Sequence, residues 1–163
     1  MVYFRKFKNE QFGGNETELS SYFDAMSKAK KEYSRCLEPV CRDFGLTQNE
    51  LTVLLFLRNN PSLDRAADIV SCRGIAKSHV SLAVSQLEAR GILARRYDPS
   101  DHRACHLALT GKGMDIAEAG SQRQRQFFEA LYAGVTPEER ELMRSVTRKI
   151  MDNVAAFECE TAK

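Results

Sequence analysis

The stretch that decides the fold runs from Leu46 to Gly113 and reads LTQNELTVLLFLRNNPSLDRAADIVSCRGIAKSHVSLAVSQLEARGILARRYDPSDHRACHLALTGKG. It contains helical patterns on either side of a turn that holds Gly74. Two short alternating segments follow, joined by the polar run 98–103. This order predicts a helix-turn-helix followed by a β-hairpin. A helix of this kind fits the major groove of DNA, and such a hairpin fits the neighbouring minor groove, so we predict a DNA-binding regulator.

Long helical patterns flank this centre on both sides. The first spans residues 17–44, where Pro39 is expected to kink or shorten it, because proline lacks the backbone donor. The other two span 110–132 and, after a strong start at Thr136, residues 137–157. Inside the centre we expect helices at 47–58, 62–70 and 75–90 and strands at 92–97 and 104–109. The predicted fold is mainly α with a small β-hairpin wing, in the order α-α-α-α-β-β-α-α: a winged helix-turn-helix with long terminal helices.

The terminal helices carry apolar stripes that are wider than the small centre can cover. Pairing these helices between two chains would bury the stripes, so we predict a homodimer. A helix bundle that closes within one chain is the alternative. The predicted organisation is a flexible lead-in (1–16), an N-terminal dimerisation helix (17–45), a DNA-binding lobe (46–112) and C-terminal dimerisation helices (113–163).

Composition excludes some classes of protein and leaves others open. Hydrophobic residues at 43% and charged residues at 28% are ordinary for a globular protein, and the longest apolar run, 51–57, is too short to span a bilayer. Residues 1–8 lack the apolar segment of a secretion signal, so we expect a cytoplasmic protein without a membrane partner. Segment 73–112 carries seven basic and three acidic side chains in a chain of net charge +2. Positive charge therefore gathers where phosphate attraction would need it.

The helix expected at 75–90 has two opposite faces. Its apolar arc holds Ala76, Val80, Ala83, Val84 and Leu87, and its polar arc holds Lys77, Ser78, Ser81, Ser85 and Glu88. Lysine pairs with guanine or phosphate, and serine is small enough to let the backbone approach a base edge. Solvation of a surface helix explains each residue alone equally well. The turn, the helix and the basic loop together favour DNA.

For each of two residues in this helix, two interpretations remain open. Leu82 lies at the edge of the polar arc, where it contacts a thymine methyl or fills a gap beneath the wing. His79 lies between the two arcs and is either a packed, hydrogen-bonded histidine or a DNA contact.

The hairpin loop has its own candidates. Asp101 and Arg103 are close enough to pair, which would orient the guanidinium toward a narrow minor groove. A solvated surface ion pair is the alternative. Arg95 and Arg96 point to opposite faces of a strand, so one of them reaches DNA. The complete predicted DNA-binding set is Arg73, Lys77, Ser78, His79, Ser81, Leu82, Ser85, Arg95, Asp101, His102 and Arg103.

The motifs of this segment also occur together in a known family. They are Lys77-Ser78-His79-Val80-Ser81, Leu87-Glu88-Ala89-Arg90-Gly91-Ile92-Leu93, Asp98-Pro99-Ser100-Asp101-His102-Arg103 and Leu109-Thr110-Gly111-Lys112-Gly113, with Thr136-Pro137-Glu138-Glu139 further on. In this order and spacing the chain resembles the multiple-antibiotic-resistance regulator (MarR) family of winged helix-turn-helix repressors. The resemblance covers about two thirds of the chain strongly, and the rest by the order of its helices.

The resemblance implies a dimer held by its first and last helices on a pseudo-palindromic double-stranded DNA operator. It places Lys77, Ser78, His79 and Ser81 at the major groove and Asp101 and Arg103 in the wing. It also implies release of DNA by a small aromatic or phenolic effector, for which Tyr33, Phe44 and Phe56 are candidates that core packing explains equally well. Leu82 and His102 stand where the family often has arginine, which weakens one DNA contact and the charge of the wing.

Other chemistries receive less support. Asp98, Asp101, His102, Cys105 and His106 look like a metal cluster, but Cys105 and His106 are neighbours on a strand and point apart, so we predict no metal and no cofactor. No nucleotide-binding glycine loop or catalytic signature occurs, so we expect no enzyme.

Two alternatives remain open within a non-enzymatic protein. The five cysteines are expected to be free thiols, yet Cys36 and Cys41, near Arg35 and Arg42, would suit a thiol-based redox sensor of the same fold. The other alternative is a winged-helix module that binds protein and not DNA.

Overall fold

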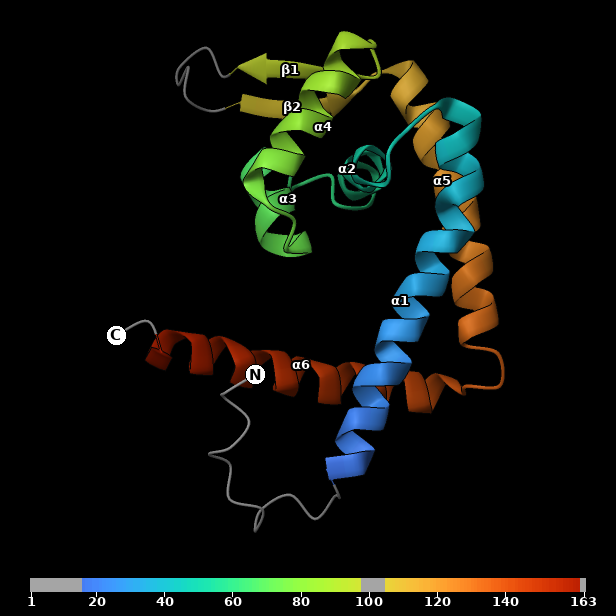
Figure 1. Cartoon of the computed structure of the whole chain (residues 1–163), viewed down its shortest axis with the longest axis vertical. Helices are drawn as coiled ribbons and strands as arrows, with labels where there is room; N and C mark the ends of the chain where they lie inside the picture. Colours follow the sequence, from blue (N-terminus) through green and yellow to red (C-terminus); the bar gives the residue numbers. More distant parts are fainter. Residues whose placement is uncertain (1–15, 98–104, 162–163) are drawn as a thin grey trace. The chain divides into compact units, whose positions relative to one another are not determined.

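The computed structural model describes the backbone of residues 16–97 and 105–161, and side chains within 21–97 and 105–157. Its helices are α1 (Glu16–Phe44), α2 (Gln48–Asn59), α3 (Ala66–Arg73), α4 (Lys77–Ala89), α5 (Gly111–Leu131) and α6 (Pro137–Thr161) (Figure 1). Its strands are β1 (Leu93–Tyr97) and β2 (Cys105–Leu109), which form one antiparallel pair. The predicted order of elements and the mainly α class with a hairpin wing are confirmed.

The chain divides into two compact units, with the boundary between Phe127 and Phe128 inside α5. The first unit contains α1 to α4, the hairpin and most of α5. The second contains the end of α5 and all of α6. The boundaries expected at 16, 45 and 112 separate segments by their expected role and not by compactness, so they stay a prediction.

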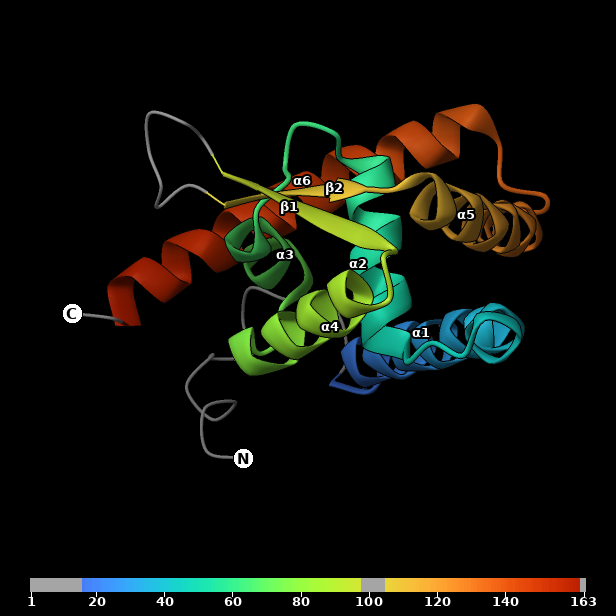
Figure 2. The same cartoon turned by 90° about the horizontal axis from the view of Figure 1, so that it is seen from above.

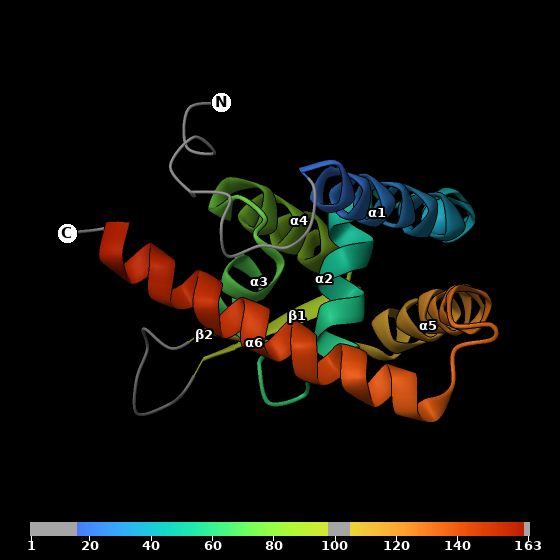
Figure 3. The ribbon, with the colours of Figure 1, turned by 90° about the horizontal axis from the view of Figure 1, so that it is seen from below.

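The core of the first unit surrounds α2. This helix is buried on almost every side, from Leu51 through Leu57, because it packs against α1, α4 and β2. Figures 2 and 3 show α2 between the α3–α4 pair and α5, with the hairpin crossing it. Burying such a run of leucine, valine and phenylalanine contributes roughly 1.5–3 kcal/mol per large side chain. A helix with no exposed face is therefore held in place by all of its neighbours.

Local signals set most helix ends as expected. The Thr47 hydroxyl accepts from the Glu50 amide at 3.2 Å, and the Glu50 carboxylate accepts from the Thr47 amide at 2.6 Å, which forms the predicted capping box. Thr136 and Glu139 repeat this reciprocal pair at the start of α6, at 2.8 and 3.3 Å. Gly74 ends α3 with a φ of 62°, a conformation that costs little without a Cβ.

The first helix ends at Phe44 as expected, and Pro39 does not shorten it, because Leu37, Val40 and Cys41 around the proline are buried in the core. The kink expected at Pro39 stays a prediction. One expected helix bound is wrong. The third helix does not start at Ser62. The Asp68 carboxylate accepts from the Arg65 amide at 2.9 Å and starts α3 at Ala66.

The hairpin is attached to the rest of the unit by β2. Leu93 pairs with Leu109 and Arg95 with Leu107 in the antiparallel register. The Leu107 amide donates to the Asp64 carbonyl at 2.7 Å, and His106 Nδ1 lies 2.8 Å from Asp64 Oδ1. The loop before α3 therefore holds the wing strand. Among the described helices, none is both long and apolar enough to cross a membrane.

Candidate nucleic-acid interface

The predicted apolar arc of α4 is largely confirmed. Val80, Ala83, Val84 and Leu87 are all buried, and they turn the helix so that its other side faces outward. Ala76 is the exception, because it lies before the first turn and is exposed. Burial of one stripe exposes the opposite face over its whole length.

That exposed face collects most of the residues that the sequence pointed to. Lys77, Ser78, His79, Ser81, Leu82 and Ser85 are all exposed on α4. His79 is not the packed histidine of the alternative interpretation. Leu82 is 58% exposed, so it does not fill a gap beneath the wing. The face therefore offers one lysine ammonium, three small hydroxyls, one imidazole and one large apolar side chain.

The N-terminal end of α4 suits an anion. Ala76 precedes the helix and provides no side-chain cap for the first backbone N–H groups. Uncapped N–H groups and the helix dipole attract negative charge, and the adjacent Lys77 ammonium adds to this attraction. A DNA phosphate has the charge that this end favours.

Arg73 and Arg95 are both engaged within the protein. The Arg73 guanidinium lies 5.4 Å from the centroid of the buried Phe56 ring, a cation–π arrangement that holds the arginine beside the turn before α4. Arg95 Nε lies 2.9 Å from a Glu88 carboxylate oxygen, and another Arg95 nitrogen donates to the Ser85 hydroxyl at 3.2 Å. Arg95 therefore ties strand β1 to α4.

The remaining site predictions concern the wing. Asp101, His102 and Arg103, including the expected Asp101–Arg103 pair, lie outside the described residues. Asp98, which with Asp101 and His102 belongs to the candidate metal ligands, also lies outside the described residues. His106 is instead bound to Asp64, and the described parts of the chain contain no group of three or more side chains that could hold a metal ion.

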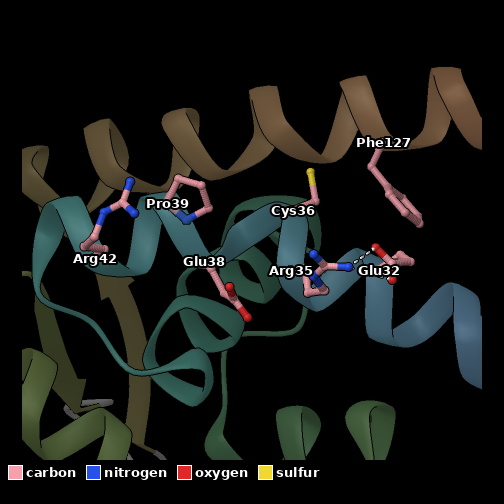
Figure 4. A pocket seen from close by; sticks show the side chains of 7 residues that line it. All are labelled: Glu32, Arg35, Cys36, Glu38, Pro39, Arg42 and Phe127. Atoms are coloured by element: carbon pink, nitrogen blue, oxygen red, sulfur yellow. Dashed lines mark hydrogen bonds and ion pairs between the residues drawn. The ribbon is translucent and has the colours of Figure 1, made fainter.

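A cavity of about 430 Å³ lies between α1 and α5. It is lined by Glu32, Arg35, Cys36, Glu38, Pro39, Arg42 and Phe127 (Figure 4). The Cys36 thiol points to α5 and donates to the Arg123 carbonyl at 3.5 Å. The sequence pointed to other aromatic residues: Phe56 is buried in the core, and Tyr33 packs edge-on against Phe127 at 5.4 Å between ring centroids.

The thiols differ in their surroundings. Cys36, Cys41, Cys72 and Cys105 are all free. Burial raises the pKa of the Cys41 thiol, and the negative charges of Glu50 and Glu38 raise it further. A raised pKa leaves less of the reactive thiolate, so Cys41 is poorly suited to oxidant sensing.

Sequence reasoning missed the polar links that position the exposed face. Asp64, Glu88 and Arg90 each bond to a residue at least seven positions away. A long separation along the chain carries no local signal for such a contact. For Arg90 the sequence offered the basic character of segment 73–112 and a place in the motif at 87–93, but neither signal indicated its partners.

The geometry agrees with a known family. The sequence signature of the MarR family matches residues 44–104, which include α2, α3, α4 and the first strand of the hairpin. Over these residues the chain matches the MarR family of transcription regulators. The relatives that the chain resembles along most of its length are also named as transcriptional regulators, which supports a DNA-binding regulator.

Related proteins extend this match beyond the central segment. The transcriptional repressor MprA of Escherichia coli K12 is 24% identical over 97% of this chain and 89% of its own. Among solved structures, the Staphylococcus aureus MepR–DNA complex has a TM-score of 0.69 and 22% identity over 86% of this chain and 99% of that one. Bordetella bronchiseptica BpsR, solved to explain how 6-hydroxynicotinic acid regulates its DNA binding, has a TM-score of 0.62 and 24% identity over 80% and 98%. These structures share the fold of this chain.

Proposed function

We propose that this chain is a MarR-family, homodimeric repressor of a pseudo-palindromic operator. One α4 from each chain enters a major groove, and each wing reaches the adjacent minor groove. The exposed Lys77–Ser85 face of α4 carries this proposal, since a surface of small hydroxyls beside one cation fits closely against base edges. Two such helices related by a twofold axis would read half-sites roughly 34–36 Å apart.

We assign the predicted DNA-binding residues to three roles. We assign Arg73, Lys77, Ser78, His79, Ser81 and Leu82 to the major groove and its phosphates, and Asp101, His102 and Arg103 to the minor groove. Ser85 and Arg95 already bond to each other, so we assign them to holding the hairpin against α4. The name of the MprA repressor, which matches along nearly the whole chain, supports repression as the direction of control.

Selection of operators from a random DNA pool tests the proposal. Lys77→Ala and Ser81→Ala are expected to change the selected half-site sequence, because their side chains face the bases. Arg103→Ala is expected to lower affinity with little change of sequence, because a minor-groove cation reads mainly electrostatic potential. Equal operator binding by all three variants would refute the assignment of helix and wing.

Salt dependence separates this function from a protein-binding module. Neutralising phosphates releases counterions, so operator affinity is expected to fall steeply as salt rises. A winged-helix module that binds protein would show no affinity for any DNA in the pool. Selection that yields no enriched sequence, at any salt concentration, would support that alternative.

A small aromatic acid is the effector that we propose for release of DNA. The α1–α5 cavity presents Arg42 for a carboxylate and Phe127 for a ring, whereas Arg35 in the same lining already pairs with Glu32 at 3.1 Å. The DNA binding of BpsR is regulated by an aromatic acid. Calorimetric titration with 6-hydroxynicotinic acid as the probe tests this. Binding that weakens at least about tenfold in Arg42→Ala supports the site, since an arginine–carboxylate bond is worth about 1.5–3 kcal/mol. Unchanged binding in that variant would exclude it.

A further inference from the structure

Arg90 joins three helices through one side chain. It caps the C-terminal end of α4, and its two terminal nitrogens donate to the Gly45 carbonyl at 2.9 Å and the Phe44 carbonyl at 2.7 Å, at the end of α1. The first of these nitrogens also lies 3.8 Å from a carboxylate oxygen of Glu50, in the first turn of α2. The exposed face of α4 is thus linked directly to α1.

The Arg90 guanidinium stabilises each of the groups that it contacts. The last carbonyls of a helix have no partner inside the helix, and a cation at this end interacts favourably with the helix dipole. Glu50 is only 3% exposed, and a buried carboxylate is costly without a nearby positive charge. Its other oxygen already accepts from the Thr47 amide and hydroxyl at 2.6 and 2.9 Å. One planar guanidinium therefore serves the carboxylate and two carbonyls together.

These contacts add to the packing that α4 and α1 share through a third helix. Helices α1 and α4 both pack against α2. The buried stripe from Val80 to Leu87 fixes how α4 rests on that core. Arg90 adds a hydrogen-bonded link from the end of α4 to the end of α1.

We propose that Arg90 is a positioning residue for operator binding, which sets the separation of the two α4 helices in the dimer. The inference rests on the proposed homodimer, in which α1 belongs to the dimer contact and α4 reads DNA. With the link intact, α4 keeps one placement relative to the dimer axis. Without it, the end of α4 moves relative to α1, and the two reading helices tolerate more than one spacing.

A series of operators that differ only in the spacing of their half-sites, in steps of one base pair, tests this. The wild type is expected to lose at least about tenfold in affinity for each step from its optimum. Arg90→Ala is expected to bind about tenfold more weakly at that optimum and to lose less than about threefold per step. The selected half-site sequence should stay unchanged, because Lys77 and Ser81 are intact.

Arg90→Lys separates positioning from simple stabilisation. Lysine keeps the positive charge beside Glu50, but as a compact point charge it does not hold both carbonyls as the guanidinium fork does. The melting temperature of Arg90→Lys is therefore expected to return toward the wild-type value. The variant should still bind operators of several half-site spacings with similar affinity. A merely structural role would restore both properties together. Arg65→Ala, which removes the side chain of an exposed arginine just before α3, is the control of equal charge and should keep the wild-type spacing preference.

The spacing experiment distinguishes failure of the Arg90 inference from failure of the proposed function. A sharp wild-type spacing optimum in Arg90→Ala would overturn the inference and leave the proposed function intact. If Arg90→Ala does not fold, a sharp optimum in Arg90→Lys overturns it in the same way. Failure of the wild type to select any operator would instead overturn the proposed function itself.

Discussion

At the scale of single residues, two glycines at the start of α5 face different surroundings. A Cβ placed on Gly113 would lie 2.2 Å from the Ile92 carbonyl oxygen, whereas one on Gly111 would meet no atom within 4 Å. The Thr110 hydroxyl holds this junction together, since it donates to the Ile92 carbonyl at 3.0 Å and accepts from the Gly113 amide at 3.1 Å. The helix starts directly against the strand segment that it covers.

Gly113→Ala is therefore expected to lower the free energy of unfolding by about 3 kcal/mol, because the added carbon would displace backbone. Gly111→Ala is the matched control and should stay within about 0.5 kcal/mol of the wild type. Urea unfolding of both variants provides the measurement. Equal stability of the two would show that the close approach at Gly113 is absent in solution.

Glu118 gives a residue-scale prediction about pH. Hydrogen bonds from Arg125 and Arg58 hold the pKa of the Glu118 carboxyl below its usual value of 4.5. A lowered pKa in the folded state contributes stability above the unfolded pKa, and this stability is lost as pH falls through the folded pKa. Thermal melting from neutral pH to about pH 3 should therefore show a smaller loss in Glu118→Gln than in the wild type. Identical pH profiles would contradict this.

At the scale of elements, the wing is attached by polar contacts on both strands. Strand β1 is joined to α4 through Arg95 and Glu88, and strand β2 to the loop before α3 through His106 and Asp64. Both pairs are part-exposed, and exposed ion pairs are usually worth only about 0–1 kcal/mol. We therefore expect these pairs to fix the orientation of the hairpin and to contribute little to the stability of the fold.

Arg95→Ala and Glu88→Ala are each expected to weaken operator binding about threefold, which corresponds to breaking one such pair. The double variant should be no weaker than either single one, because both changes remove the same contact. Fluorescence anisotropy with a selected operator measures all three. Tighter binding by Glu88→Ala would instead show that Arg95, once released, contacts DNA itself.

At the scale of the whole molecule, α6 carries an apolar face with no cover within its own unit. Leu142, Val146, Ile150 and Val154 recur at the spacing of one helix face, and each is at least 44% exposed. Such a face is costly to leave in water, and a second copy of the chain would cover it. The proposed dimer places this face at its centre.

Ile150→Glu is expected to raise the dissociation constant of the dimer at least about a hundredfold, because an unpaired carboxylate would be buried at the contact. Operator affinity should fall with it, since one half-site alone remains. Arg148→Gln, which changes the charge equally on the opposite side of α6, should leave both unchanged. Light scattering gives the mass of each variant, and a dimeric Ile150→Glu would place the contact elsewhere.

The local pattern of the chain was enough for the order of the elements and for the exposed face of α4. Thr47 with Glu50, Gly74, and the spacing of Val80 and Leu87 act over three to seven positions, within the reach of helix geometry. The same reasoning placed the third helix too early, since the Asp68 carboxylate competes with Ser62 as a start signal and only one start is formed.

Tertiary structure alone decided which distant side chains meet. Arg90 reaches carbonyls 45 and 46 positions away, and His106 reaches Asp64 across 42 positions. Such contacts depend on how the buried faces of several helices stack and on which rotamers the packing leaves open, and neither is encoded in a local window of sequence. For this reason the exposed face of α4 was foreseeable from the chain, whereas the side chains that link α4 to its distant neighbours were not.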